Sequence, residues 1–588
     1  MKDFLKYTLA TIVGMMLVGI LMTVLSIISL AGMMASEGMS SPIEDNSILR
    51  INLSGSISER GGEDNPFSTL MGNKYETLAL DEALIALKKA AKEDKVKGIY
   101  LEGGALSAEP AQMEELRQAL VEFKKSGKWI IAYGDVMTKQ AYYLCSVADS
   151  IYINPIGSVD WSGMMSQPMF YKGLMEKVGV KMQVFKVGTY KSAVEPYICT
   201  EMSPANREQV GSFLGSIWGN MMKAVAKSRK IKMENLEAIA DSQTVLTNVQ
   251  AAVENGLVDK LCYKDEVKAI LKQLAEVDED ESLTFTSLSD VAKAETLSDK
   301  HDDKIAVYYA VGEIAADGAN FSNESVITAA TMTKDLHELA EDEDVKAVVI
   351  RVNSPGGSAY ASEQIWREVQ LLKEKKPVII SMGGLAASGG YYISCGATKI
   401  LAEATTLTGS IGIFGMIPDA SELLTQKLGL SFDIVKTNAL SDLGAMGRPF
   451  NEAECQLMQC NIERGYDLFT NRVAMGRGIT QDSVKVIAEG RVWTGEQALK
   501  IGLVDKLGNL DAAIEEAAKA ANLEEYGIMR APEEKPWFTQ LLDKGGSDYM
   551  EDQMRAALGE YYTAFSLLRT IQHRDPIQAR LPFEPNLK

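Results

Sequence analysis

Residues 376–411 read KPVIISMGGLAASGGYYISCGATKILAEATTLTGSI, and this stretch decides the fold. Its β-branched run at 378–380 is typical of a buried strand, and a helix is expected to begin at or just after Ser388. Residues 128–159, KWIIAYGDVMTKQAYYLCSVADSIYINPIGSV, repeat the pattern in the first half of the chain. A strand–helix unit that occurs twice predicts an α/β fold built by internal duplication.

Four more pairs of blocks recur in the same order and at a near-constant separation. They are ILRINLSGSI (48–57) with IAVYYAVGEI (305–314), DKVKGIYLEGG (94–104) with DVKAVVIRVNSPGG (344–357), VGVKMQVFKVGTYKS (178–192) with LGLSFDIVKTNALSD (428–442), and NVQAAVENGLVDKL (248–261) with TGEQALKIGLVDKLG (494–508). Each copy alternates strands with helical patterns, which favours βαβ units around parallel sheets.

The blocks divide the chain into two tandem domains and their connections. We expect the copies to span residues 47–275 and 304–530, joined by an acidic linker at 276–303. Residues 531–588 are expected to form a helical tail. Its amphipathic stretch, 548–572, could cap the fold, join subunits or pack as an ordinary surface helix.

The N-terminal segment, residues 1–46, differs from the rest. Residues 8–36 carry no charge, and such a length exceeds the roughly 20 residues that a membrane-spanning helix needs. A cleavable signal peptide has a shorter apolar core and an A-x-A-like end, so we favour an uncleaved anchor. Lys2 and Lys6 on the short flank predict a cytoplasmic N-terminus and an extracytoplasmic body.

The overall composition argues against several classes of protein. The net charge is −20 and Lys/Arg runs are short, which gives nucleic-acid binding little electrostatic support. The six cysteines show no C-x-x-C spacing, so a zinc site is not expected, and buried free thiols are the favoured interpretation.

The two copies differ at positions that carry chemistry. Alignment on the shared Tyr-Tyr pair places Ser388 opposite Lys139, and alignment of Lys186 with Lys436 places Lys191 opposite Ser441. The first copy therefore keeps a lysine and the second keeps a glycine-flanked serine. This reciprocal loss predicts one catalytic site whose parts are divided between the copies.

A serine nucleophile needs a base, and the chain offers few histidines. His301 lies in the linker, His337 in an acidic helical run and His573 in the tail, so a Ser-His-Asp triad would need a fortuitous approach. Lys191 is a better candidate, because burial between the copies would lower the pKa of its amine towards neutrality.

Glycines near the serine are suited to stabilise an oxyanion. The first N–H groups of the helix after Ser388 lack intrahelical partners, which makes the amide of Gly389 a candidate donor. The NSPGGS segment, 353–358, offers Gly356 or Gly357 as the second donor, since glycine lets the backbone approach a ligand closely. Ordinary turn glycines are the alternative.

NSPGGS, AASGGYYIS, TGSIGIFG (408–415) and VGTYKSAVEP (187–196), in a duplicated chain behind one anchor, resemble the long form of bacterial signal peptide peptidase A, or protease IV. The resemblance covers roughly residues 47–530 and implies two ClpP/crotonase-like domains and a serine–lysine dyad of Ser388 and Lys191. It maps a lysine-orienting serine to Ser410. It also implies a homo-oligomer, a tetramer in characterised members, on the outer side of the cytoplasmic membrane, without metal or cofactor.

The expected function is therefore a membrane-anchored serine endopeptidase that degrades apolar signal peptides left in the membrane. A crotonase-type acyl-CoA enzyme would share the fold and the oxyanion hole, but needs neither the dyad nor the anchor. A non-catalytic membrane scaffold is the third possibility. The sequence leaves open the substrate preference and whether the two dyad residues come from one chain or from neighbouring chains.

Overall fold

The structure is a computed structural model of the 588-residue chain. It describes residues 42–61, 77–242, 244–294, 301–316, 326–533 and 577–581, with a few positions between residues 6 and 22. Most of the predicted anchor at 8–36, and all of the amphipathic stretch at 548–572, lie outside the described residues. Within the described part, no helix combines the length and apolarity that a bilayer crossing requires.

The first copy is built on a parallel sheet with the order β2-β1-β3-β4-β5-β7, and β8 also pairs with β1. Its strands are β1 (Ser47–Ser58), β2 (Thr77–Ala79), β3 (Val96–Ser107), β4 (Trp129–Met137), β5 (Ser150–Val159), β7 (Lys260–Leu261) and β8 (Phe285–Thr286). Its helices are α3 (Leu80–Lys92), α4 (Pro110–Phe123), α5 (Lys139–Cys145), α6 (Lys172–Val178), α7 (Glu195–Ile198), α8 (Pro204–Arg229), α9 (Met233–Asp241), α10 (Thr244–Thr247), α11 (Gln250–Glu254), α12 (Lys264–Leu274) and α13 (Leu288–Lys293).

The second copy repeats this design in the order β18-β16-β14-β12-β9-β20, with β15 and β19 attached beside β14. Its strands are β9 (Lys304–Val311), β12 (Val345–Ser354), β14 (Val378–Ala387), β15 (Lys399–Ala402), β16 (Leu407–Gly409), β18 (Val492–Thr494), β19 (Lys506–Leu507) and β20 (Gly527–Ala531). Its helices are α14 (Ala329–Glu341), α15 (Ala359–Lys375), α16 (Gly389–Ser394), α17 (Glu452–Arg477), α18 (Gln481–Ile487), α19 (Gly495–Lys500) and α20 (Leu510–Ala521).

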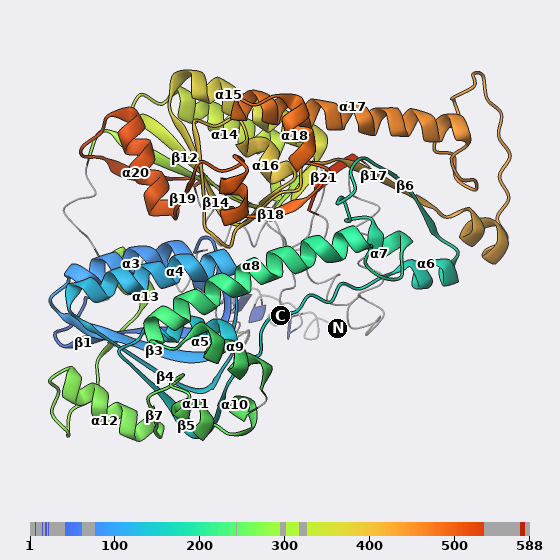
Figure 1. Ribbon diagram of the computed structural model, residues 1–588. Coiled ribbons are helices and arrows are strands. Elements are labelled where there is room, and N and C mark those ends of the chain that lie inside the picture. Colours follow the sequence, from blue (N-terminus) through green and yellow to red (C-terminus); the bar gives the residue numbers. More distant parts are fainter. Residues whose placement is uncertain are drawn as a thin grey trace.

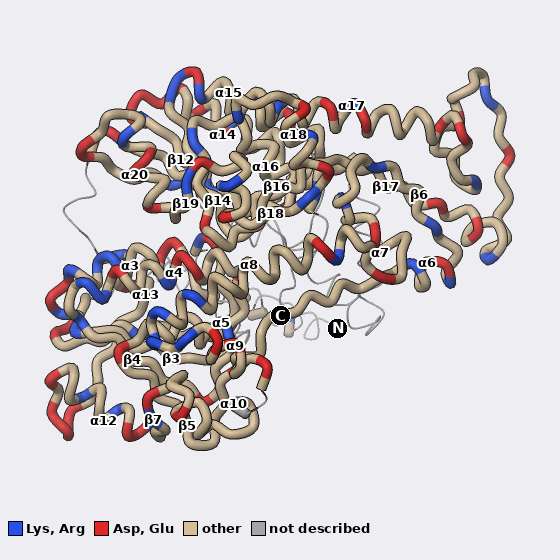
Figure 2. Tube along the Cα trace, in the orientation of Figure 1, with Lys and Arg blue, Asp and Glu red and all other residues tan. Residues whose placement is uncertain are grey.

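The duplicated α/β fold is thus present as predicted. Strands β1, β3 and β4 correspond to β9, β12 and β14, and helices α4 and α8 correspond to α15 and α17. The two sheets lie one above the other, with α3, α4 and α8 of the first copy between them (Figure 1). Lys and Arg are interspersed with Asp and Glu along both copies (Figure 2).

A third sheet joins the copies, in the order β11-β10-β13-β21-β17-β6. Its strands are β6 (Lys181–Lys186), β10 (Glu313–Ala315), β11 (Val326–Thr328), β13 (Gly356–Ser358), β17 (Phe414–Asp419) and β21 (Ile577–Arg580). Strand β6 leaves the first copy and pairs antiparallel with β17 of the second. The chain that follows β6 is therefore carried onto the second copy.

The tail differs from the sequence-based expectation where it is described. Residues 577–580 form strand β21, not a helix, and pair antiparallel with both β13 and β17. Two strand edges with unpaired backbone groups recruit a short extended segment whatever its intrinsic preference.

The burial of the apolar strands, and of half of the cysteines, agrees with the expectation from the sequence. All ten residues of β14 are buried, as expected for a continuous apolar run in a parallel sheet. The six cysteines are free in the structure, and Cys145, Cys262 and Cys395 are buried as expected. Cys199 and Cys455 are only partly buried and Cys460 is exposed, so the buried interpretation was wrong for those three.

Candidate active site

Ser388 lies at a sharp turn between strand β14 and helix α16. Its backbone has φ 56° and ψ −111°, a conformation that non-glycine residues rarely adopt. Small neighbours permit the turn, because a side chain at Gly390 would lie 2.8 Å from the carbonyl oxygen of Ser354. A strained residue held by its surroundings is typical of a functional site.

Lys191 reaches this serine from the other copy. Its side chain is fully buried, and its Nζ lies 2.8 Å from Ser388 Oγ. The same nitrogen donates to the carbonyl oxygen of Ser410 at 3.0 Å and to its Oγ at 3.1 Å. The structure thus brings together three of the predicted site residues, which are far apart in the sequence, within one chain.

The pKa of Lys191 is lowered well below the usual value of a lysine amine. Burial is the cause, because the ammonium form loses its hydration in the interior. The polar groups within hydrogen-bond reach of Nζ belong to Ser388 and Ser410, which carry no charge to offset that loss. The environment therefore favours a neutral amine with a free lone pair.

The sequence did not point to Gly490, whose backbone packs against the buried side chain of Lys191. Gly490 has φ 77°, and a Cβ there would lie 2.6 Å from Lys191 Cβ. The backbone of Tyr190 donates to the carbonyl oxygen of Glu489, which fixes the loop beside this glycine. In the sequence, Gly490 stands in an EGR segment outside the motifs named above, and such a glycine is typical of an ordinary turn.

The candidate oxyanion donors are neighbours in space. A Cβ added to Gly356, whose φ is 92°, would lie 2.6 Å from the amide nitrogen of Gly389. The Gly356 amide donates to Ser354 Oγ at 3.2 Å, and both Gly356 and Gly357 pair with β21 in the third sheet. Both glycines therefore stay candidates for the second donor.

Strand β21 occupies the edge where an extended substrate would be expected. It lies between β13 and β17, with Gly357 opposite Ala579 and Phe414 opposite Gln578. The same hypothetical Cβ on Gly356 would be 2.2 Å from the carbonyl oxygen of Ala579. Peptides that bind by strand addition need these same edges, so β21 and a substrate would exclude one another.

Displacing β21 should therefore raise activity. Ala579 is fully buried, and Ala579→Asp would place an unpaired charge there, which favours release of the strand. We expect kcat/KM for a short peptide to rise about tenfold, which corresponds to about 1.4 kcal/mol of lost competition. Ala579→Ser is the matched control and should stay near wild type. Equal rates for both variants would show that the strand does not compete.

The histidines named from the sequence do not form this cluster. His337 is exposed and lies 3.3 Å from Glu368 on the surface of the second copy. His301 lies just before β9, and His573 is outside the described residues. Lysine, rather than histidine, is the amine that the structure brings to Ser388.

Comparison with known proteins assigns the class. Residues 122–278 and 370–524 each match the profile described as Peptidase family S49, so this chain belongs to that family and is a serine peptidase. The double match agrees with the duplicated fold. Residues 321–408 also match the profile described as Clp protease.

Full-length relatives show the same relationship. The chain is 35% identical to Protease 4 of Salmonella typhi, covering 90% of this chain and 86% of that one. It is 34% identical to Protease 4 of Haemophilus influenzae, with coverage of 85% and 83%. It is 32% identical to the chloroplastic serine protease SPPA of Arabidopsis thaliana, with coverage of 82% and 70%.

Ser410 can be tested by removing its hydroxyl. Ser410→Ala deletes one of the two acceptors that Ser410 offers to the Lys191 amine and leaves its carbonyl acceptor in place. We expect kcat to fall about 10²-fold with KM little changed, because a misdirected lone pair lowers the efficiency of proton transfer. Thr408→Val, a buried hydroxyl nearby that donates to the carbonyl oxygen of Ala386, is the control. A variant with wild-type kcat would contradict the orienting role.

Proposed function

We propose that this chain is a membrane-anchored endopeptidase that uses a Ser388–Lys191 dyad to degrade signal peptides left in the membrane after precursor processing. The observation that carries the proposal is the 2.8 Å separation of Lys191 Nζ and Ser388 Oγ in a fully buried setting. A neutral amine at hydrogen-bond distance from a hydroxyl is the arrangement that an activated serine nucleophile requires.

The reaction would proceed as an acyl transfer. The lone pair of Lys191 takes the hydroxyl proton as Ser388 Oγ attacks the scissile carbonyl. The amide of Gly389 and that of Gly357 or Gly356 stabilise the resulting oxyanion. The lysine then protonates the leaving amine and later activates the water that releases the acyl group from the serine. Ser410 keeps the two amine hydrogens turned away from the nucleophile.

The proposed organisation follows the duplication. Residues 47–275 supply the lysine and residues 304–530 supply the serine, with 276–303 as the linker and 531–588 as the tail. Residues 1–46 would include the anchor and hold the body on the outer side of the cytoplasmic membrane as a homo-oligomer, with four subunits as the proposed number. An anchored body suits apolar peptides that stay at the bilayer.

Peptide hydrolysis tests the assignment directly. The full chain in mild detergent should cleave a chromogenic apolar peptide, and a fluorophosphonate should label Ser388. Ser388→Ala should abolish both signals. Turnover of an acyl-CoA thioester with no peptide hydrolysis would instead indicate a crotonase-type enzyme. Inactivity towards both substrates would indicate a non-catalytic membrane scaffold.

The pH profile tests the lysine separately. Only the neutral amine can accept the proton, so kcat/KM should rise with pH through the folded-state pKa of Lys191 and then level off. Because burial lowers that pKa well below the usual value, the plateau should begin well below pH 10. Measurement of kcat/KM from pH 5 to 10, with folding checked at each pH, decides this. A rate that climbs only near pH 10 would mean that the lysine is not desolvated in solution.

A further inference from the structure

The segment that carries Lys191 passes from the surface to the interior within a few residues. Thr189 is exposed and Tyr190 is partly buried, whereas Lys191 and Ser192 are buried. The lysine therefore lies only two residues along the chain from bulk water. Its amine loses its charge at ordinary pH only while water is kept away from it. A lysine base at this place needs groups that hold the segment closed.

One buried side chain binds the residues on both sides of Lys191. Gln209, on α8, is fully buried. Its Nε2 donates to the carbonyl oxygen of Tyr190 at 3.0 Å and to Ser192 Oγ at 3.0 Å. The residue before the lysine and the residue after it are thus held by the same amide group.

The same side chain also reaches the second copy. Its Oε1 accepts from the backbone amide of Val492, on β18, at 3.2 Å. Strand β18 pairs antiparallel with β16, where Val492 faces Gly409. The carbonyl oxygen of Gly409 accepts from the amide of Ser388 at 2.8 Å. Gln209 therefore connects the segment of Lys191 to the strands that position Ser388.

The hydrogen bonds around Gln209 fix the direction of its amide. Ser192 Oγ donates to Asn206 Oδ1 at 2.9 Å, so its oxygen is left to accept from Gln209. Asn206 Nδ2 donates in turn to Glu195 Oε2 at 2.9 Å. The reversed amide of Gln209 would present a donor to the backbone amide of Val492. A buried network in which donors meet acceptors in one arrangement is rigid.

The second copy lacks this glutamine, as it lacks the lysine. Helices α8 and α17 both contain 26 residues, and each ends at an arginine that bonds to an equivalent aspartate. With the two helices aligned, Gln209 falls opposite Leu457, which is 39% exposed. Ser441 stands where the first copy has Lys191. The glutamine is thus present only in the copy that carries the lysine.

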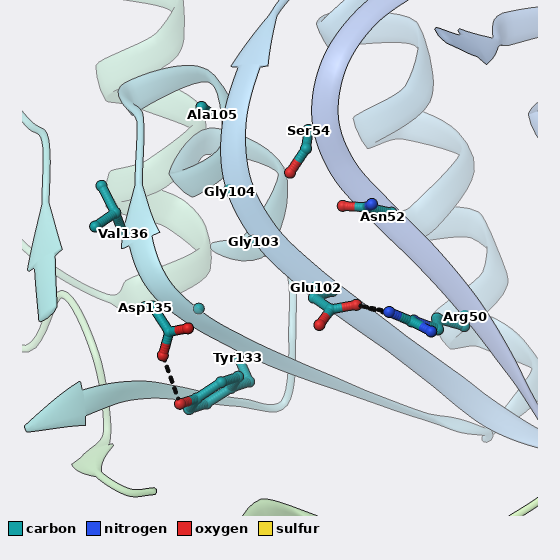
Figure 3. A pocket seen from close by; sticks show the side chains of 11 residues that line it. Arg50, Asn52, Ser54, Glu102, Gly103, Gly104, Ala105, Tyr133, Asp135 and Val136 are labelled. Carbon is teal, nitrogen blue, oxygen red and sulfur yellow. Dashed lines mark hydrogen bonds and ion pairs between the residues drawn. The ribbon is translucent and has the colours of Figure 1, made fainter. Parts of the chain in front are cut away.

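The open cavity of the first copy shows that the sheets do not exclude water by themselves. It has a volume of ≈ 380 Å³, and its lining includes Glu102 and Tyr133, which face each other on β3 and β4 (Figure 3). The equivalent pair in the second copy, Arg351 and Ser381, is buried where α4 packs on that copy. Burial of polar groups in this fold depends on the elements that cover the sheets. The segment of Lys191 is covered by α8 and by the loop before β18.

We propose that Gln209 is a positioning residue of the dyad, which holds the segment of Lys191 against β18 and thereby keeps the amine dehydrated and directed at Ser388. The inference rests on the proposed function and adds a residue to its site. The hydrogen bonds of Gln209 go to backbone groups and to Ser192 and Asn206. It therefore acts through the place of the lysine and not on the substrate.

Replacing Gln209 by methionine tests the positioning role. Methionine keeps the length of the side chain and removes all of its hydrogen bonds. We expect kcat for a chromogenic peptide to fall about 10²-fold with KM little changed, because proton transfer is impaired and substrate binding is not.

Gln497→Met is the matched control. Gln497 donates to Ser212 of α8 and accepts from the amide of Thr494 of β18, so it joins the same two elements without touching the lysine segment. Its kcat should stay near that of the wild type. Equal losses in both variants, or none in Gln209→Met, would overturn the proposal.

The pH profile is a readout that a loss of stability alone would not move. An opened segment would hydrate the ammonium form of Lys191, so the pKa of its amine should rise towards the usual value. The acid limb of kcat/KM should therefore move to higher pH in Gln209→Met and stay in place in Gln497→Met. The charged side chains on the surrounding elements, which both variants leave unchanged, are Glu195, Glu208, Glu489 and Arg491. An acid limb at the wild-type pH in Gln209→Met would contradict the role.

A double substitution tests whether the glutamine acts through this segment. Ser192→Ala removes one acceptor of Gln209 Nε2 and leaves the carbonyl oxygen of Tyr190 in place, so kcat should fall by about tenfold. Because both residues belong to one network, the double variant should lose no more than Gln209→Met alone. A combined loss equal to the product of the single losses would show that they act separately.

Urea unfolding tests the inference without any activity. Lys191→Met removes the cost of burying the amine, and that cost is largest in acidic buffer. The same substitution should raise the urea midpoint less in the Gln209→Met chain, where the amine is already hydrated. Equal gains in both backgrounds would refute the inference and leave the peptidase assignment untouched. Unequal gains in a chain that cleaves no peptide would instead reject the peptidase assignment and keep the role of Gln209.

Discussion

Replacing Lys191 by alanine or methionine is expected to lower kcat by about 10⁴-fold or more while the chain stays folded. Loss of one member of a concerted nucleophile–base unit removes most of the catalysis that the unit supplies. Methionine is the sharper choice because it keeps the buried volume and removes only the amine. Peptide hydrolysis under saturating substrate measures the effect.

The same variant should be more stable at neutral pH. The folded-state pKa of Lys191 lies below its unfolded value, so folding carries a cost that is largest below the folded-state pKa and disappears only above the unfolded pKa. Lys191→Met removes this cost, and its urea midpoint should rise at pH 7. Lys181→Met, on β6 with an exposed amine, is the control and should change neither quantity. Activity within tenfold of wild type in Lys191→Met would end the lysine-base hypothesis.

Replacing Arg351 by methionine is expected to produce the largest loss of stability. Its guanidinium is buried, donates to Glu59 at 2.7 Å and to Glu115 at 2.6 Å, and joins the second copy to two carboxylates of the first. Removing one partner of a buried ion pair costs about 3–5 kcal/mol, because the remaining charges keep their desolvation penalty. Urea unfolding at pH 7.5 measures the loss.

The loss should shrink in acid and with matched substitutions. Burial raises the pKa of Glu115, with Arg351 acting against that shift, so the unpaired carboxyl is protonated more readily in the variant. Stability relative to wild type should therefore recover as the pH falls, and Glu59→Gln with Glu115→Gln should restore part of it at pH 7.5. Lys346→Met, which breaks a surface pair with Asp303, should shift the midpoint little. An Arg351→Met chain as stable as this control would contradict the role of the network.

The Arg351 variant should also lose activity. The first copy supplies Lys191 and the second supplies Ser388, so their 2.8 Å separation depends on how the copies are docked. Weakening the contact at Arg351 should lower kcat although this residue does not touch the dyad. The pH profile of the remaining activity should keep the form that Lys191 sets. The measurement would therefore distinguish an effect on the packing of the two copies from an effect on proton transfer.

Sequence patterns alone predicted the duplication, the α/β class and the division of the dyad, with Lys191 in the first copy and Ser388 in the second. These are properties of local composition: apolar β-branched runs such as 378–380 need burial in any context, and a glycine-flanked Ser388 needs a turn. The comparison of copies singled out Lys191 because a residue kept in only one half is visible without coordinates. Strand β21 was missed, since residues 577–580 become a strand only when β13 and β17 offer their edges.

By itself the sequence determined which residues could do chemistry and which segments are equivalent. Only the tertiary structure decided that Lys191 is fully buried against Gly490, that its nitrogen meets Ser388 and Ser410, and that Arg351 binds two carboxylates of the other copy. The physical reason is that desolvation and hydrogen-bond geometry depend on the atoms that surround a group in space. Those atoms come from segments that are distant in the chain, so no local pattern records them.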